Sequence, residues 1–349
     1  IDWELQQAAY DMMGDRAGAV LAINPQTGEI LTWLSKPGYN PEDFTLPVSP
    51  LQAETIFNDP LHPLFDRNIQ GEYSPGSLFK IVTALAALES GKASADTEYE
   101  CNGFIRIGYD RKIYRCWKNR KHGILDLKGA ITNSCNVYFY QLGMATGGKN
   151  ISDMAFKMGF GSKSQDIFSY ENTGLIPTAE WKSEKFKQIW YPGDNANLAI
   201  GQGYVAVNPL QLLKSFSAVA AGGKVYAPRL VKMILSPAGE IIRKTEPVLE
   251  KKLDISEENL AFVRDSLREV AESGTAKYLN LDLDIAAKTG TAENPHGEDH
   301  AWFAAFAPVE DPQIAIVVLV EHGGYGSVSA LPVAREMLKV KFRDILDEK

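Results

Sequence analysis

The sequence predicts an α/β fold in which one antiparallel sheet of about five strands is built from both ends of the chain and covered by helices. Short apolar runs separated by turn residues occur near both termini, whereas the middle of the chain has mostly helical spacing with polar loops. The predicted sheet subdomain comprises residues 1–95 and 276–349, and a mostly helical subdomain is inserted at 96–275. A chain of 349 residues with 45% hydrophobic and 23% charged residues is long enough for two such units.

The first ninety residues are predicted to form a helix, a hairpin and a second helix. Helical spacing of apolar residues indicates a helix over 1–13, and strand candidates at 19–23 and 29–34 flank the turn residues of 24–28. After Pro75-Gly76, a helix of about fourteen residues is expected to begin at Ser77 and to end at Gly91. Its apolar residues form one stripe: Leu78, Ile81, Val82, Leu85 and Leu88.

The C-terminal part is predicted to form three strands, over 284–291, 301–306 and 314–320, followed by a helix over 331–346. The apolar run from Ile314 to Val320 is much shorter than the roughly 20 residues that a membrane-spanning helix needs. Lys plus Arg is 36 and Asp plus Glu is 44, giving a net charge of −8. This acidic balance disfavours a nucleic-acid partner, because phosphate binding requires clustered positive charge.

Three short motifs supply the residue types of a serine acyl-transfer site: Ser77-Leu-Phe-Lys80, Ser134-Cys-Asn136 and Lys288-Thr-Gly290. The first two are expected by chance about once each in this composition, but the third only about 0.08 times. Ser77 and Lys80 lie three residues apart at a helix start, so they share a face. A neutral lysine amine is able to take the serine proton if burial lowers its pKa.

Each motif also has an ordinary structural explanation when it is considered alone. Ser77 and Ser134 are typical helix-capping residues, and Lys288 is typical of an exposed strand end. The segment Lys288 to Thr291, however, places a lysine and two hydroxyls on one strand, which suits recognition of a carboxylate. Because glycine has no side chain, Gly290 allows an extended peptide to pair closely with that strand.

The ordered set of three motifs resembles the penicillin-recognising serine acyltransferases, which include penicillin-binding proteins and serine β-lactamases. Further segments are similar to the class B D,D-transpeptidases of the penicillin-binding protein 2 type. These segments are 73–80, 174–177, Trp181-Lys182, Gly193-Asp194 with Asn197, 200–203, 208–211 and 288–293. The similarity extends from about residue 5 to 340. Family members also have an N-terminal membrane anchor and a non-catalytic pedestal, and because this chain begins at Ile1 we expect both to precede it.

The resemblance implies a role for each motif residue in the cleavage of a peptidoglycan stem peptide that ends in D-Ala-D-Ala. Ser77 would be the nucleophile and Lys80 its general base, while Ser134 and Lys288 would pass a proton to the leaving amine. Asn136 would hold the stem-peptide amide. The carboxylate of the substrate would bind at the strand of Thr289, Gly290 and Thr291. The backbone N–H groups of Ser77 and Thr291 would form the oxyanion hole.

The resemblance also implies partners and a location. β-Lactams would acylate the same serine, and the acceptor would be a second stem peptide. A SEDS-type glycosyltransferase and the cell-elongation machinery would be protein partners. The domain would be periplasmic, attached to the inner membrane only through the anchor, and would have no organic cofactor.

Alternative functions remain at this point. A serine β-lactamase uses the same nucleophile but needs a water-activating group, and no segment of this sequence is assigned to that task. A β-lactam-sensing receptor domain would acylate once and signal. A D,D-carboxypeptidase would use water as the acceptor.

The three cysteines and one histidine form a separate group with the spacing Cys101-x14-Cys116-x5-His122-x12-Cys135. Three thiolates and one imidazole complete a tetrahedral Cys₃His set for structural zinc. Relatives in the subfamily resemble this chain in having a metal site near the Ser-x-Asn loop. Two alternatives are a Cys101–Cys116 disulfide that leaves Cys135 free, and three unpaired thiols.

Overall fold

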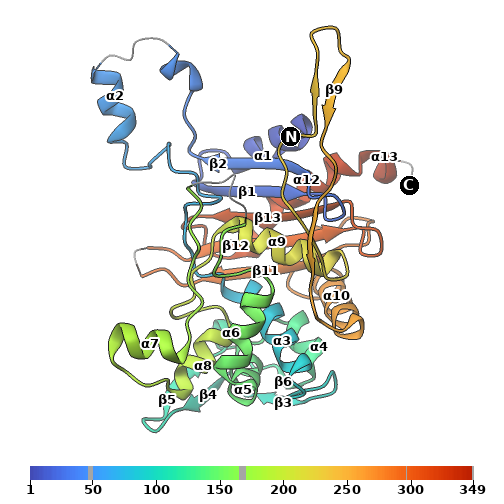
Figure 1. The fold of residues 1–349 in the computed structure, drawn as a ribbon. Helices are drawn as coiled ribbons and strands as arrows, with labels where there is room; N and C mark the ends of the chain where they lie inside the picture. Colours follow the sequence, from blue (N-terminus) through green and yellow to red (C-terminus); the bar gives the residue numbers. More distant parts are fainter. Residues whose placement is uncertain (46–49, 165–169, 296, 348–349) are drawn as a thin grey trace.

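The computed structural model describes residues 1–45, 50–164, 170–295 and 297–347. Its centre is a five-stranded antiparallel sheet with the order β11-β12-β13-β1-β2, as the sequence predicts (Figure 1). The N-terminal strand β1 lies beside the C-terminal strand β13, with Val20 opposite Val318, and this pairing joins the two ends of the chain. The strands are β1 (Gly18–Ile23), β2 (Ile30–Lys36), β11 (Ala286–Ala292), β12 (His300–Ala307) and β13 (Ile314–Val320).

Helices cover both faces of this sheet. The helices α1 (Trp3–Met13) and α12 (Leu331–Lys341) pack together on one face, and α9 (Pro209–Ala220) crosses β13 and β1 on the other. The helix α10 (Glu257–Glu272) packs along β11. All residues of β13 are buried, as expected for a central strand between two helical layers. The helix predicted over 331–346 is divided at Phe342 into α12 and α13 (Arg343–Asp347).

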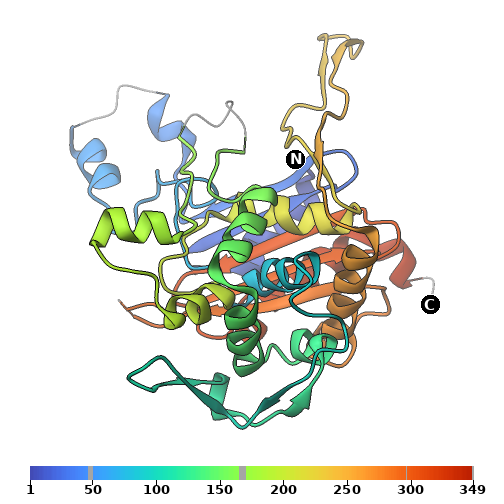
Figure 2. The same cartoon turned by 60° about the horizontal axis from the view of Figure 1, so that its bottom comes forward.

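The helices of the middle of the chain, α3 to α8, gather at the β11 side of the sheet (Figures 1 and 2). Their centre is α3 (Lys80–Glu89), which packs against α4 (Leu127–Thr132), α5 (Asn136–Thr146), α6 (Gly148–Lys157) and α10. Residues 80–87 of α3 are all buried, so this helix is enclosed on every side and lacks the single apolar stripe that was predicted. The other helical elements are η1 (Pro41–Phe44), α2 (Pro50–Phe57), η2 (Gly76–Phe79), η3 (Trp117–Asn119), α7 (Ala179–Phe186), α8 (Pro192–Ala199), η4 (Lys277–Leu279) and α11 (Gly326–Ser329).

Four small two-stranded sheets occur between residues 96 and 275, and the sequence did not predict them. They pair β3 (Tyr99–Cys101) with β6 (Gly123–Leu125), β4 (Phe104–Ile107) with β5 (Lys112–Arg115), β7 (Lys224–Tyr226) with β10 (Leu249–Lys252), and β8 (Met233–Leu235) with β9 (Ile241–Lys244). Strands of three or four residues are too short to show a reliable alternation in the sequence. The β8–β9 hairpin projects away from the body of the molecule (Figure 1).

Candidate active site

Ser77 lies in the short 3₁₀ turn η2, which leads directly into α3. The sequence predicted an α-helix starting at Ser77, but the α-helix begins at Lys80. Gly76 has φ +53°, and a Cβ atom there would lie 2.4 Å from the carbonyl oxygen of Thr291. Only glycine therefore allows the turn to pass this close to β11. In a 3₁₀ turn, residues three apart are eclipsed, so Ser77 and Lys80 still lie on one side.

Two lysine amines from distant parts of the chain meet at the hydroxyl of Ser134. The Lys80 Nζ lies 3.2 Å from Ser134 Oγ, 2.8 Å from the Ser134 carbonyl oxygen and 2.6 Å from Asn136 Oδ1. The Lys288 Nζ donates to Ser134 Oγ at 2.8 Å and to the Thr289 carbonyl oxygen at 3.1 Å. The tertiary structure thus brings the three sequence motifs together.

Burial controls the protonation of both lysines. Each side chain is fully buried. Burial lowers the pKa of Lys80 to about 8, although the nearby Cys116 and Cys135 thiols oppose this effect. The pKa of Lys288 is held well below its ordinary value, first by burial and then by the charge of Lys80. Neutral amines are therefore accessible near physiological pH, as a lysine general base requires.

The Ser134 loop is held between two helices, α4 and α5. The sequence predicted this break between helices over 127–132 and 137–145, and the structure confirms it to within one residue. Ser134 has φ +51°, an uncommon conformation for a residue other than glycine, and its side chain is buried. Cys135 caps α5, because its Sγ accepts a hydrogen bond from the Tyr138 N–H at 3.4 Å.

A cleft of about 990 Å³ opens over these groups. Its lining includes all three motifs, through Ser77, Ser134, Asn136, Thr289, Gly290 and Thr291. The strand β11 is an edge strand of the sheet, the position from which an extended peptide can be added. The Thr289 hydroxyl donates to the Thr275 hydroxyl at 2.7 Å. Thr275 lies in the loop after α10 and belongs to no motif, so it could not be identified from sequence patterns.

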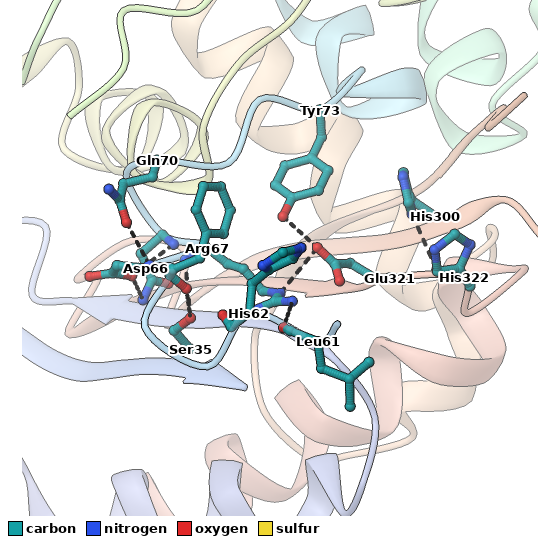
Figure 3. A network of polar contacts seen from close by, with 12 residues as sticks. Ser35, Leu61, His62, Asp66, Arg67, Gln70, Tyr73, His300, Glu321 and His322 are labelled. Carbon is teal, nitrogen blue, oxygen red and sulfur yellow. Dashed lines mark hydrogen bonds and ion pairs between the residues drawn. The ribbon is translucent and has the colours of Figure 1, made fainter. Parts of the chain in front are cut away.

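A partly buried polar contact anchors the segment that precedes Ser77 (Figure 3). The Tyr73 hydroxyl donates to Glu321 Oε1 at 2.6 Å, and Arg67 Nε lies 3.1 Å from the same oxygen. Glu321 directly follows β13, so this contact ties the segment that leads to Ser77 to the centre of the sheet. Burial and the neighbouring Glu321 carboxylate raise the pKa of Tyr73, which keeps its hydroxyl protonated as a donor. The backbone of Tyr73 also exchanges two hydrogen bonds with Val207.

Replacement of Tyr73 by Phe should therefore slow acylation of Ser77 while leaving the ring packing intact. A hydrogen bond to a charged acceptor contributes about 1.5–3 kcal/mol. If part of this energy positions the nucleophile, the acylation rate falls about fivefold and the melting temperature falls by a few degrees. Stopped-flow acylation and calorimetry measure both quantities, with Tyr109→Phe on a fully exposed tyrosine as control. A Tyr73→Phe variant that is acylated as fast as the control would contradict this role.

The three cysteines and His122 form a buried cluster next to the Ser134 loop. Their ligand atoms all lie within 4.8 Å of one another. His122 Nδ1 lies 3.6 Å from the Sγ atoms of both Cys101 and Cys116, and the Cys116 and Cys135 Sγ atoms are 3.9 Å apart. None of the three cysteines forms a disulfide, so the Cys101–Cys116 alternative is not the arrangement in this structure.

The cluster has the chemistry and the size of a tetrahedral zinc site. Zinc bonds of about 2.3 Å to sulfur and about 2.1 Å to nitrogen give sulfur–sulfur edges of about 3.8 Å and sulfur–nitrogen edges of about 3.6 Å. The three separations given above, 3.6, 3.6 and 3.9 Å, are close to these values, and all the ligand atoms lie within 4.8 Å of one another. Hydrogen bonds from Cys135 and His122 lower the pKa of the Cys116 thiol, which favours the thiolate that a metal requires.

Residues 18–339 match the family described as "Penicillin binding protein transpeptidase domain". The chain belongs to this family. A relative of this transpeptidase domain, the peptidoglycan D,D-transpeptidase MrdA of Haemophilus influenzae, is 32% identical over 97% of the chain. The alignment covers 55% of MrdA, so the chain spans about half the length of the curated relatives it matches.

Three solved structures are also similar to this transpeptidase domain. Pseudomonas aeruginosa PBP2 in complex with WCK 5153 has a TM-score of 0.88 and 33% identity, covering 98% of this chain and 74% of that chain. The ceftriaxone acyl-enzyme of Mycobacterium tuberculosis penicillin-binding protein A has a TM-score of 0.87 and 28% identity, covering 97% and 78%. Helicobacter pylori PBP2 in complex with MreC has a TM-score of 0.85 and 31% identity, covering 98% and 63%.

The segments that resembled the class B family also meet in the transpeptidase domain. Lys182 and Asp194 form an ion pair at 2.5 Å, and Gly201 accepts a hydrogen bond from the N–H of Gly76.

In the part of the chain that the structure describes, none of the helices has the length and apolar character needed to span a bilayer.

Proposed function

We propose that this chain is the catalytic domain of a peptidoglycan D,D-transpeptidase of the MrdA type that works in lateral cell-wall elongation. The observation that carries the proposal is the meeting of two buried lysine amines at Ser134, in the cleft that Ser77 lines. Family membership and the acyl-enzyme of the mycobacterial relative support a serine acyl-transfer reaction.

The proposed reaction begins when Ser77 Oγ attacks the carbonyl carbon of the penultimate D-Ala. Lys80 takes the serine proton. A neutral amine has only two N–H donors, so Lys80 keeps at most two of its three present acceptors in that state. Its lone pair is then available to the serine hydroxyl. The oxyanion forms beside the backbone N–H groups of Ser77 and Thr291, where one donor typically contributes about 3–4 kcal/mol.

The second half of the reaction needs a proton for the leaving amine. Ser134 accepts from Lys288 and also contacts Lys80, so its hydroxyl is placed to pass a proton along this chain of groups. The C–N bond breaks as its nitrogen receives the proton that Lys80 took from Ser77, and the terminal D-Ala leaves as a free amine. The amine of a second stem peptide then attacks the ester on Ser77, which forms the crosslink and restores the hydroxyl.

Intact-protein mass spectrometry after incubation with a penicillin tests this function. We expect one adduct on Ser77 that persists for much longer than the mixing time, and its absence in Ser77→Ala. A rapidly cleared adduct would favour the serine β-lactamase alternative, and the absence of any adduct would overturn the proposed function. A long-lived adduct alone does not separate a transpeptidase from a sensing receptor, but only the transpeptidase forms crosslinked dimers from stem-peptide substrates.

The rate of acylation should rise with pH, because the neutral form of Lys80 is the base. Burial lowers the pKa of Lys80 to about 8, so the reactive fraction increases as the pH is raised through this value. We expect the second-order rate constant for acylation to increase about tenfold from pH 7 to pH 9 and then to level off. Stopped-flow fluorescence with a labelled penicillin measures this profile. A flat profile, or a fall over the same range, would contradict the assigned base.

The Cys₃His cluster is proposed to bind one structural zinc ion through Cys101, Cys116, His122 and Cys135. The donor set and the ligand separations support this assignment. A bound zinc supplies a rigid crosslink between four chain segments. Because Cys135 stands between Ser134 and Asn136, that crosslink would fix the loop that contacts Lys80.

The partners and location proposed here follow the relatives. The MreC complex of Helicobacter pylori PBP2 supports binding to the elongation machinery, and a SEDS-type glycosyltransferase is the proposed source of new glycan. The domain is proposed to lie in the periplasm, held at the inner membrane by an N-terminal anchor. Co-purification of the full-length protein with each partner, from cells in which both are tagged, tests these assignments.

A further inference from the structure

A basic segment borders the active-site cleft of this acidic protein. Residues 104–122 contain seven Lys or Arg and one Asp, although the whole chain has a net charge of −8. The segment comprises the β4–β5 hairpin and η3. Four exposed cations line the cleft and are called the basic rim below: Lys112, Arg115 and Arg120 of this segment, and Lys277 of η4.

The basic rim is not neutralised by the protein itself. Elsewhere on the surface, Arg268 pairs with Asp265, Asp284 and Glu310 within 3.0 Å. Among the residues that the structure describes, no carboxylate lies within 4.0 Å of a rim nitrogen. The contacts of the rim are instead weak or aromatic: Arg115 Nη1 lies 3.4 Å from Asn119 Oδ1, and Arg120 and Lys277 lie over the rings of Trp117 and Tyr278.

The cysteine cluster keeps this segment in place. Cys101 is the last residue of β3, Cys116 directly follows β5, and His122 directly precedes β6. The segment therefore begins and ends in the buried cluster beside α5. The backbone that carries Lys112, Arg115 and Arg120 is therefore held beside the cleft that these residues line. Unpaired charges fixed at a cleft attract ligands of opposite sign.

We propose that the basic rim binds carboxylate groups of the donor peptide upstream of the bond that Ser77 attacks. The preferred substrate is then an acidic peptide with a free carboxylate in addition to its C-terminal one. The inference rests on the proposed function, in which β11 takes the C-terminal carboxylate of the substrate. The residues of the peptide that precede its C-terminus must then lie against parts of the cleft lining other than the carboxylate site at β11. The acidic residues of the cleft lining, Glu293 and Asp299, belong to the loop between β11 and β12. Because these carboxylates repel an acidic peptide, we expect the peptide to follow the basic rim instead.

Two synthetic pentapeptides that end in D-Ala-D-Ala test this inference. One has a γ-linked D-Glu with a free α-carboxylate at its second position, and the other has the amide of that carboxylate. Each peptide competes with a fluorescent penicillin for Ser77, so its inhibition constant is obtained without the need for turnover. The test variant is Lys112→Gln/Arg115→Gln/Arg120→Gln. The matched control is Arg106→Gln/Arg111→Gln/Lys121→Gln, which removes the same charge from the same segment but outside the cleft.

We expect the wild-type domain to prefer the free acid about tenfold, or about 1.4 kcal/mol. The test variant should lose this preference, the control should keep it, and 0.5 M NaCl should reduce it in the wild type. Equal inhibition constants for the two peptides in the wild type would overturn the inference, as would an equal loss of preference in both variants. Failure of the wild type to react with penicillin would instead overturn the proposed function on which the inference rests.

Discussion

Replacement of Lys80 by Met should lower the rate of acylation of Ser77 by a penicillin about 10³-fold. General base catalysis contributes roughly 10²–10⁴ to a rate, and this lysine is the proposed base. Met retains the length and much of the apolar stem of Lys, so it fills the same buried space. Because burial disfavours the lysine cation, we expect the melting temperature to be retained or raised.

The matched control for this variant is Lys92→Met, on an exposed lysine just after α3. It should be acylated at the wild-type rate. Stopped-flow fluorescence gives the rates, and calorimetry verifies that both variants are folded. A folded Lys80→Met variant with more than about a tenth of the wild-type rate would show that another group takes the serine proton.

Replacement of Cys135 by Ser should lower the melting temperature and the acylation rate together. Serine retains the helix-capping position of Cys135 at the start of α5, so the change chiefly removes a metal ligand. Loss of a structural metal is among the few changes that cost more than about 4 kcal/mol, or roughly 5 °C for a domain of this length. Because Ser134 and Asn136 flank this residue, we expect acylation to slow about 10-fold to 100-fold.

A strong chelator should have the same effect on the wild type, but little further effect on Cys135→Ser. Native mass spectrometry should show one zinc ion on the wild type and none on the variant. As a control for helix capping alone, Asp126→Ala removes the N-cap of α4 and should cost only about 1 kcal/mol. An unchanged melting temperature in chelator, together with no metal in the purified protein, would contradict the zinc proposal. The cluster would then consist of three unpaired thiols and a histidine.

The strands β1, β12 and β13 were predictable because each has a run of apolar residues long enough to be distinguished from a loop. For β13, seven consecutive apolar residues predict a strand buried on both faces, and the structure has the same bounds. The small strands β3 to β6 were not predictable, because three or four mixed residues show no periodicity. Their place is determined by the cluster of Cys101, Cys116, His122 and Cys135, whose members lie up to 34 positions apart in the sequence.

The residue types of the active site were also predictable, because Ser, Lys and Asn at short spacings identify three motifs. The protonation states of the two lysines, in contrast, could not be predicted from the sequence. The low pKa of Lys80 and Lys288 comes mainly from burial, which no motif encodes. The contact of Tyr73 with Glu321 joins residues 248 positions apart, and Glu321 belongs to no motif in the sequence.

The amino-acid sequence by itself determined which strands form the main sheet, which long helices cover it, and which residue types occur together in the three motifs and in the group of Cys and His residues. Those properties are local, since they depend on periodicity and on side-chain type. The tertiary structure alone decided that two amines meet at one hydroxyl, that both are buried enough to lose a proton, and that four cations border the cleft. Distance, burial and unpaired charge depend on packing between segments far apart in the chain, and packing exists only once the chain is folded.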